Sequence, residues 1–341
     1  MLGLLADMLQ NSNITEQAVE RERETILREM QEVESIDEEV VFDKLHYTAY
    51  RDHPLGYTIL GPTENIRSLT RDDLIEYQKS HYTGNRLVIA GAGGISHENL
   101  VSYAQEHFGG VPADTPEGLP QPVLEPAAFT GSDIQVRYDS YPHASIAFGF
   151  PVGGWNDPDH IPLQLIQQIL GNYNKATSFG NGKYSSSELV AKVAEQNLAH
   201  SFHVFNTQYS DTGLFGISAT AHEHTVDHLM QTLFYEVTKL SYECTEDILE
   251  QSKNQLKTTL LTHIDSNDKV CEDIGRHMLQ YNRHIPLAEL FARIDSVDTK
   301  AIINTAKRFF YDRDFAMASL GPTGELSDYG HYRRRTYWWR Y

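Results

Sequence analysis

The residues of this chain best suited to chemistry are the carboxylates of one acidic stretch. Residues 16–43 hold eleven Asp and Glu side chains against three Arg, a local net charge of −8. Glu22 and Glu29 are seven residues apart, and Glu39 and Asp43 are four apart. We expect this stretch to form a helix, on which the two members of each pair share one face. Carboxylates aligned in this way can bind a metal, and an acidic groove can hold a basic ligand.

Two interpretations of this stretch stay open on the residues alone. Charge runs are usually solvated helix faces, and pairs such as Glu24 with Arg28 stabilise such a helix slightly. The alternative is that Glu29 ligates zinc, with Glu22 behind it. A catalytic zinc needs three protein ligands, usually including His, and an open position for water. No histidine lies in this stretch or before it.

A second candidate metal site is the histidine-rich segment AHEHTVDH. His224 and His228 have the i,i+4 spacing of a two-histidine helical site, and Glu223 and Asp227 could be further ligands. The chain contains neither HExxH nor HxxEH, so a polar helix start explains this segment better. The loop at residues 180–188 lacks the spacing of a phosphate-binding loop, and a flexible turn with a Ser N-cap is favoured there.

Composition limits the class of protein. The 341 residues favour two domains. A net charge of −19 argues against nucleic-acid binding and for solubility or basic partners. The apolar runs are short, so we expect no membrane span. The tail at residues 333–341 is basic and aromatic, and is either a disordered extension or a docking segment.

The hydrophobic pattern predicts a mixture of helices and strands. The proline-rich residues 111–128 are expected to form a linker. Thr70 should cap a helix that runs through His81, with Asp73 completing a capping box. Other helices are expected at His97–Phe108, Asp157–Leu170, Ser187–Ala194 and near 224–240, 245–262 and 268–281. Strands are expected at Arg86–Gly93, Ile134–Tyr138, Ser145–Pro151, Ala199–Asn206 and Leu214–Thr220.

The chain also repeats itself. The segment from Thr70 lies over the segment from Asp298 at a constant offset of 228, and Thr15-Glu16 lies over Thr245-Glu246 at an offset of 230. Each half therefore runs helix, helix, helix, strand and glycine turn, which favours two domains of one fold. The second copy has 116 residues between Phe129 and Thr245, whereas only 14 precede Thr15. We expect the first domain to lack roughly 100 residues by comparison.

Long specific motifs resemble one family. They are ERERETILREMQEVESIDEEVVFDKLH, HPLGYTILGPTENIRSLTRDDLIEYQKSHYTGNRLVIAGAGG, GNYNKATSFGNGKYSSSELVAKVAEQNLAHSF, VCEDIGRHMLQYNRHIPLAE and the tail RRRTYWWRY. Together they make the whole chain similar to the mitochondrial processing peptidase β/core 1 family, a group of inverted zincins of the pitrilysin–insulysin type. The tail looks like that of the form integrated in the respiratory complex.

The resemblance implies a fold class and a set of domains. The family's fold is α+β, with two homologous α/β-roll domains whose sheets are rich in antiparallel pairs and covered by helices. Residues 1–110 would be the C-terminal part of a first domain truncated at its N-terminus, 111–128 the linker, and 129–341 the second domain.

The resemblance also implies roles for the acidic residues. In the family, HxxEH supplies two His ligands of zinc and the general base, and a distal Glu completes the site. Glu29 matches that distal ligand, and Glu22 matches a supporting acidic position. Glu39 and Asp43 match positions that bind the arginine near the cleavage site of a presequence. HxxEH would lie before Met1, so we expect this chain alone neither to bind zinc tightly nor to cleave peptides.

The family suggests function, partners and place. The first hypothesis is a β/core 1 subunit of a zinc-dependent processing peptidase, integrated in respiratory complex III. It would pair with an α/core 2 subunit and other cytochrome bc1 subunits, and bind Arg-rich presequences from the matrix side of the mitochondrial inner membrane, as a peripheral protein. The alternative is a structural core subunit without catalysis.

Overall fold

The computed structural model describes residues 1–178 and 182–337. These residues divide into two compact units. Unit 1 comprises Met1–Glu32, Ile59–Glu125 and Leu261–Ile285, and unit 2 comprises Val33–Thr58, Pro126–Leu260 and the chain from Pro286 onward. The boundary at Glu125 falls inside the proline-rich stretch 111–128. The assignment of 1–110 and 129–341 to two homologous domains stays a prediction.

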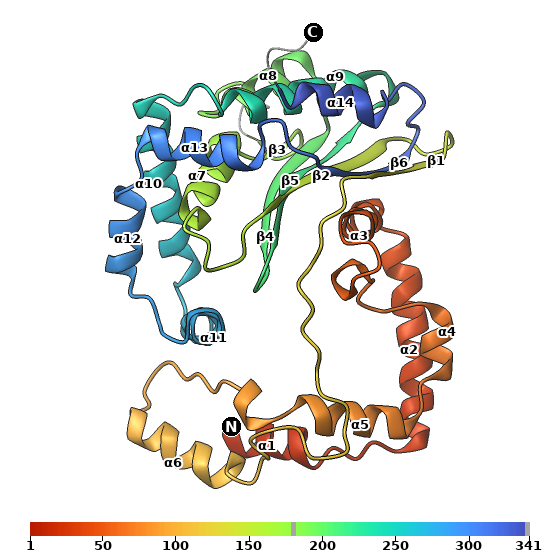
Figure 1. Cartoon of the computed structure of the whole chain (residues 1–341), viewed down its shortest axis with the longest axis vertical. Coiled ribbons are helices and arrows are strands. Elements are labelled where there is room, and N and C mark those ends of the chain that lie inside the picture. The colour runs from red at the N-terminus through yellow and green to blue at the C-terminus, as the bar shows by residue number, and fades with distance from the viewer. Residues whose placement is uncertain (179–181, 338–341) are drawn as a thin grey trace. The chain divides into compact units, whose positions relative to one another are not determined.

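Unit 2 is built on one six-stranded sheet, whose strands are labelled β1 to β6 in Figure 1. The strand order is β1-β6-β2-β5-β4-β3, and every neighbouring pair is antiparallel except β1 with β6. The strands are β1 (Asp133–Arg137), β2 (Ala144–Val152), β3 (Tyr173–Asn174), β4 (Ser201–Gln208), β5 (Gly213–Ala221) and β6 (Ala316–Gly321).

The two faces of this sheet are covered by different helices. One face packs into the larger apolar cluster, in which Phe148 of β2 stacks on Phe234 with ring centroids 4.4 Å apart. Helices on that side are α7 (His160–Leu170), α8 (Glu188–Gln196), α9 (Glu223–Lys239), α10 (Glu246–His263), α12 (Leu287–Asp295), α13 (Thr299–Phe309) and α14 (Tyr329–Arg335).

The other face of the sheet is covered by α3 (Asp37–Ala49). Val41 and Leu45 of α3 are buried against Ala147 of β2 and Leu320 of β6. Side chains alternate between the two faces of a strand, so β2 can send Ala147 to α3 and Phe148 to the opposite core. This alternation explains why β2 is apolar along its whole length.

Unit 1 contains helices and irregular segments. Thr70 caps α5 with the predicted capping box, in which the Asp73 carboxylate accepts from the Thr70 backbone N–H at 2.8 Å. The helices that lie wholly in this unit are α1 (Leu2–Gln10), α4 (Thr63–Ser68), α5 (Arg71–His81), α6 (His97–Phe108) and α11 (Asn267–Tyr281). Helix α2 (Glu16–Glu34) lies mostly in unit 1, and a short 3-10 turn occurs in this unit at Gly84–Arg86, whereas the one at Pro54–Gly56 belongs to unit 2.

Two predictions need correction. The acidic stretch is not one helix, because it is interrupted at Ser35-Ile36 between α2 and α3. The strand expected at Arg86–Gly93 is wrong, since residues 87–92 are irregular. A strand needs a neighbour for its ladder hydrogen bonds, and all strands among the described residues belong to the sheet of unit 2.

The helices follow the repeat seen in the sequence. Helices α5 and α13 have the same bounds at an offset of 228, and both follow a side-chain N-cap, Thr70 and Asp298. Helices α2 and α10, like α3 and α11, begin at an offset of 230. The expected α+β class with an antiparallel-rich sheet is confirmed. In the described part of the chain, no helix is both long and apolar enough to span a membrane.

Candidate functional site

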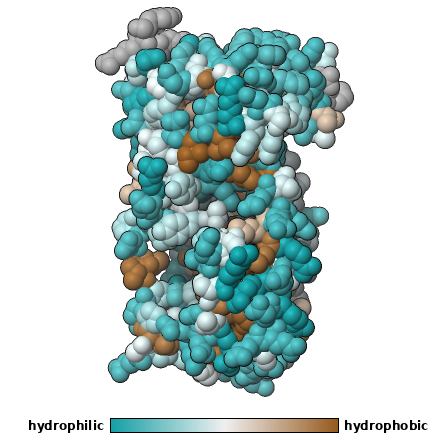
Figure 2. All heavy atoms as spheres, turned by 90° about the vertical axis from the view of Figure 1, so that its right-hand side faces the viewer, coloured by the Kyte–Doolittle hydropathy of each residue, from teal (hydrophilic) through white to brown (hydrophobic). Residues whose placement is uncertain are grey.

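Glu22 and Glu29 lie on exposed positions of α2. The helix is held in unit 1 by Arg23, whose guanidinium donates to the carbonyl oxygens of Ile66 at 3.0 Å and Leu69 at 2.7 Å. Arg23 also pairs with Glu20 at 2.8 Å. Seen from the side of α2 and α4, the surface is mostly hydrophilic, with apolar residues in separate patches (Figure 2). Both carboxylates are therefore open to solvent and to ligands.

The residues around Glu29 do not form a zinc site by themselves. Residues 1–178 and 182–337 contain two groups in which three His, Asp or Glu ligand atoms converge. One consists of His143, His200 and His222, and the other of Asp273, His277 and His284. Neither includes Glu22 or Glu29. A single exposed carboxylate falls short of the three protein ligands that a catalytic zinc needs, so no catalytic step can be assigned through Glu29 in this chain.

The second pair of predicted site residues lies on α3. Three acidic residues, Asp37, Glu38 and Glu39, occupy its first turn, where the helix dipole favours negative charge. Val41 and Leu45 hold the opposite side of the helix against the sheet. Since successive residues of a helix are rotated by about 100°, Glu39 and Asp43 project away from that core.

Asp43 is the more constrained of the two carboxylates. Glu39 is exposed, whereas Asp43 is half-buried. Burial raises the pKa of Asp43, and the nearby charge of Glu39 adds to this effect, while His46 and Lys44 oppose it. The carboxylate of Asp43 is therefore poorly compensated when ionised, and a cation placed between Asp43 and Glu39 would relieve both effects.

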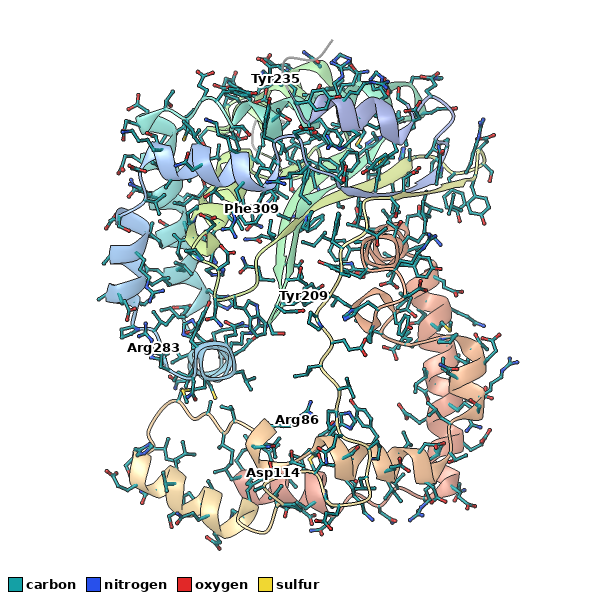
Figure 3. All side chains as sticks on the ribbon, viewed as in Figure 1. Arg86, Asp114, Tyr209, Tyr235, Arg283 and Phe309 are labelled. Atoms are coloured by element: carbon teal, nitrogen blue, oxygen red, sulfur yellow. The ribbon has the colours of Figure 1, made fainter. Side chains whose placement is uncertain are left out.

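His46 fixes the surroundings of Asp43. Its Nδ1 lies 2.9 Å from the carbonyl oxygen of Phe42, and its Nε2 lies 2.8 Å from Tyr209 Oη. A carbonyl can only accept, so Nδ1 carries the proton and Nε2 accepts from the tyrosine. Burial lowers the pKa of His46 and so favours the neutral ring, while the bond to Phe42 and the charge of Asp43 oppose this shift. Tyr209, labelled in Figure 3, directly follows β4, so this bond ties α3 to the sheet.

The arrangement on α3 is suited to binding a guanidinium group. It offers two carboxylates on one helix face, one of them partly desolvated, above a rigid support. Charge-assisted bonds between Arg and carboxylates are stronger than neutral hydrogen bonds, and burial strengthens them further. The structure thus brings Glu39 and Asp43 together as their spacing predicts.

The segment AHEHTVDH does not form the two-histidine site that its spacing allows. His224 Nδ1 lies 2.8 Å from Glu325 Oε1 and its side chain is exposed. The Asp227 carboxylate accepts from Tyr332 Oη at 2.6 Å, from Ser327 N at 3.2 Å and from Gln231 Nε2 at 2.7 Å. Burial opposes these bonds, yet together they hold the pKa of Asp227 below its ordinary value. Asp227 thus secures α14 to α9.

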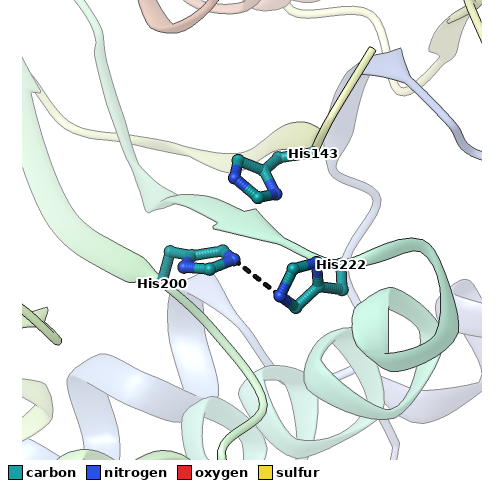
Figure 4. A group of neighbouring side chains, drawn as sticks. All are labelled: His143, His200 and His222. Atoms are coloured by element: carbon teal, nitrogen blue, oxygen red, sulfur yellow. Dashed lines mark hydrogen bonds between the residues drawn. The ribbon is translucent and has the colours of Figure 1, made fainter. Parts of the chain in front are cut away.

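The histidine group that sequence reasoning missed is shown in Figure 4. His143 precedes β2, His200 precedes β4 and His222 follows β5. The sequence could indicate that each histidine lies one residue beyond the end of a strand. It could not predict the order of those strands in the sheet, and this order brings the three histidines together.

Where the structure describes the basic tail, the tail makes ion pairs and hydrogen bonds with other parts of the chain. Arg333 pairs with Asp312 at 3.0 Å and with Asp314 at 2.5 Å. The backbone of Arg335 accepts a bond from Thr238 Oγ1 at 3.1 Å. Residues 338–341 of the predicted docking segment lie outside the described residues, as do residues 180–181 of the loop discussed above.

Two family patterns match this chain. The pattern described as "Insulinase (Peptidase family M16)" matches residues 1–63, and the one described as "Peptidase M16 inactive domain" matches residues 68–256. The chain therefore belongs to peptidase family M16. All four predicted site residues, on α2 and α3, lie within the first match, and the three histidines lie within the second.

Within that family, the chain is similar to β subunits of the mitochondrial processing peptidase. It is 46% identical to "Probable mitochondrial-processing peptidase subunit beta, mitochondrial" of Arabidopsis thaliana over 340 residues, which are 100% of this chain and 64% of the relative. It is 45% identical to the human "Mitochondrial-processing peptidase subunit beta", covering 99% and 68%. It is 39% identical to "Cytochrome b-c1 complex subunit 1, mitochondrial" of Rattus norvegicus, covering 100% and 70%. The chain thus spans about two thirds of the length of these relatives.

Solved structures support the same fold. A chain of "Complex III2 from Candida albicans, Inz-5 bound" superposes with a TM-score of 0.89 at 24% identity, covering 99% of this chain and 80% of that one. A protease from Helicobacter pylori superposes with a TM-score of 0.80 at 20% identity, covering 94% and 76%.

Proposed function

We propose that this chain is the presequence-binding part of a processing-peptidase β/core 1 subunit, in which Glu39 and Asp43 bind an arginine of the peptide. The observation that carries the proposal is the pair of carboxylates on the outer side of α3, one of them partly desolvated. The likeness to processing-peptidase β subunits over the whole chain supports it. Presequences are Arg-rich, and the net charge of −19 favours such cationic ligands.

In this proposal, zinc-dependent cleavage belongs to an assembly that supplies ligands beyond Glu29. Glu22 would support Glu29 through electrostatics rather than contact the metal. The part played by the present chain is to bind and orient the peptide. Zinc removal should therefore leave peptide binding by this chain unchanged.

The proposed partners follow from the relatives. An α/core 2 subunit and other subunits of the cytochrome bc1 complex are the proposed partners, because a relative at 39% identity is a bc1 complex subunit. The proposed location is the matrix side of the mitochondrial inner membrane, since these relatives are mitochondrial. Integration in respiratory complex III would be tested by co-purification with the other subunits.

The test of peptide binding uses fluorescence anisotropy. A labelled helical peptide with one arginine is compared with the same peptide carrying citrulline, which keeps the shape and removes the charge. We expect the combined substitution of Glu39→Gln and Asp43→Asn to weaken binding of the arginine peptide roughly tenfold, about 1.4 kcal/mol. Binding of the citrulline peptide should be weak and should not change.

Glu38→Gln is the matched control. It removes one carboxylate from the same turn of α3, at an exposed position. Unchanged binding in this variant, with a loss in the double variant, supports a specific site. Equal losses in both variants would show that only the overall negative charge attracts the peptide.

A purely structural core subunit is the second candidate. The similarity to a bc1 complex subunit and to a chain of complex III favours it. In that case the chain would assemble with its partners, while the citrulline and arginine peptides would bind equally weakly. The same titration thus separates the two functions.

A further inference from the structure

The three histidines at one edge of the unit 2 sheet have a common structural origin. Strand β2 pairs with β5 so that Ala144 lies opposite Ala221, and β4 pairs with β5 so that Ser201 lies opposite Thr220. His143 and His200 each come one residue before a strand, and His222 comes one residue after β5. The antiparallel pairing of three adjacent strands therefore places all three side chains at the same edge.

The three imidazole rings face one another (Figure 4). The ring centroids of His143 and His200 are 4.1 Å apart, those of His143 and His222 are 5.0 Å apart, and those of His200 and His222 are 4.4 Å apart. The Nε2 atoms of His200 and His222 are separated by 3.0 Å. One ring nitrogen from each histidine lies within 4.8 Å of the other two.

Backbone hydrogen bonds hold two of these histidines in place, and the third directly precedes the first residue of β2. The N–H of His200 donates to Thr220 O at 2.8 Å, and its carbonyl accepts from Lys175 N at 2.8 Å. The carbonyl of His222 accepts from the N–H groups of Thr225 and Val226, each at 3.0 Å. The rings are therefore carried by a fixed frame, and only their side-chain torsions need to change when a ligand binds.

The hydrogen bonds of the cluster leave binding capacity unused. A neutral imidazole has one donor nitrogen and one acceptor nitrogen, so the contact between His200 and His222 uses a single proton. His143 Nδ1 is buried and has no hydrogen-bond partner in the described part of the chain. A buried polar atom without a partner is costly. A cation among the three rings would give each facing nitrogen a partner.

We propose that His143, His200 and His222 form a binding site for a divalent transition metal, and that zinc is the metal bound there. Three imidazoles suit Zn²⁺, Co²⁺, Ni²⁺ and Cu²⁺, whereas Mg²⁺ and Ca²⁺ prefer oxygen ligands. With Zn–N bonds of about 2.0–2.1 Å, two nitrogens of a tetrahedral site lie about 3.3 Å apart. The spacing of 3.0 Å between His200 and His222 is close to this value.

The proposed metal site is made of residues other than Glu22 and Glu29, and it lies in the segment that matches the M16 inactive domain. It does not depend on the proposed peptide binding, since Glu39 and Asp43 lie on a different element. It also departs from the expectation that the chain binds no zinc tightly, which rested on the missing HxxEH alone. Three protein ligands leave a fourth position for water or for a donor from a partner.

The other ligand group provides an internal comparison. Asp273 Oδ2 lies 3.4 Å from His277 Nδ1 and 3.5 Å from His284 Nε2. Here one carboxylate already faces both imidazoles, and the group is explained by these contacts. The three histidines of unit 2 have no such carboxylate among them, so a metal is the better explanation for their convergence.

The proposal is tested by titrating the untagged full chain with Zn²⁺ in a calorimeter and with Co²⁺ in a spectrophotometer. We expect one equivalent of metal, with the visible absorption of Co²⁺ bound by imidazoles. His200→Ala and His222→Ala should each weaken binding at least tenfold, because either change leaves only two ligands. Circular dichroism checks folding, and the exposed His222 offers a variant least disruptive to the core.

His224→Ala and His228→Ala are the matched controls, since both histidines lie on the same helix start outside the cluster. Metal binding should be unchanged in both. Zinc should also protect His200 and His222, but not His224, from modification by diethyl pyrocarbonate. The proposal is overturned by unchanged metal binding in His200→Ala, by an equal loss in His224→Ala, or by loss of the bound equivalent in His284→Ala.

Discussion

Asp43 shows how the surroundings of one residue can prepare it for a ligand. Its pKa is raised above the ordinary 3.8 by burial and by Glu39. The folded chain therefore holds this proton more tightly than the unfolded chain. The stability that results is fully present below the ordinary pKa and is lost as the pH rises through the raised value. At neutral pH the ionised Asp43 destabilises the fold unless a cation is bound.

Asp43→Asn should therefore stabilise the protein at neutral pH. Urea denaturation followed by circular dichroism should show a higher midpoint at pH 7, and no difference from the parent chain below the ordinary pKa of Asp43, because both side chains are then neutral. Glu38→Gln serves as the control for simple charge removal. A lower midpoint for Asp43→Asn at pH 7 would contradict the proposed desolvation.

Tyr332, in contrast, stabilises an ionised carboxylate, because its hydroxyl group donates a hydrogen bond to it. The side chain is fully buried, and its Oη donates to Asp227 at 2.6 Å. Tyr332→Phe removes one of the donors that keep Asp227 ionised. We expect a loss of about 1–3 kcal/mol in the free energy of unfolding, measured by urea denaturation. Tyr184→Phe, at a side chain that is 82% exposed, should change nothing, and equal effects would refute this role.

At the scale of the elements, β2 and β5 approach so closely that glycine is required. Gly149 lies opposite Gly216 in the register. A Cβ built on Gly216 would lie 1.9 Å from the carbonyl oxygen of Phe148 and 2.7 Å from the Cα of Gly149. Both atoms belong to the backbone, so no side-chain rotation can relieve the overlap.

Gly216→Ala should consequently separate the two central strands. We expect a loss of about 3 kcal/mol or more in the free energy of unfolding, with a low yield of folded protein. Gly110→Ala is the control, because a Cβ at Gly110 meets no atom within 4 Å. A Gly216→Ala variant as stable as the parent in urea denaturation would show that these strands can move apart.

The elements also show what the sequence could predict. Thr70 marked the start of α5, because an N-cap acts through residues three positions away. The strand predicted at residues 86–93 is wrong. An apolar run can be recognised in the local sequence, whereas the neighbouring strand that a strand must pair with cannot. Glu39 and Asp43 could be paired from the sequence because one helix carries both. His143, His200 and His222 were not, because their meeting depends on the order of β2, β5 and β4.

At the scale of the whole molecule, the chain passes between the two units five times, with changes at residues 32, 58, 125, 260 and 285. Residues 33–58, which include α3, therefore complete the core of unit 2 even though they come before the proline-rich stretch. Residues 261–285, which include α11, complete unit 1 from the other side of that stretch. Each unit thus depends on both halves of the sequence.

A single cut in the proline-rich stretch should leave the protein assembled. Leu124 is 89% exposed, so limited chymotrypsin treatment should cleave after it. Two pieces should appear on a denaturing gel, while size-exclusion chromatography under native conditions should show the elution volume of the intact chain. The reason is that separation would strip α3 from the sheet and expose Ala147, Phe205 and Leu320. Leu124→Gly should resist this cut, and pieces that elute separately before denaturant is added would contradict the shared cores.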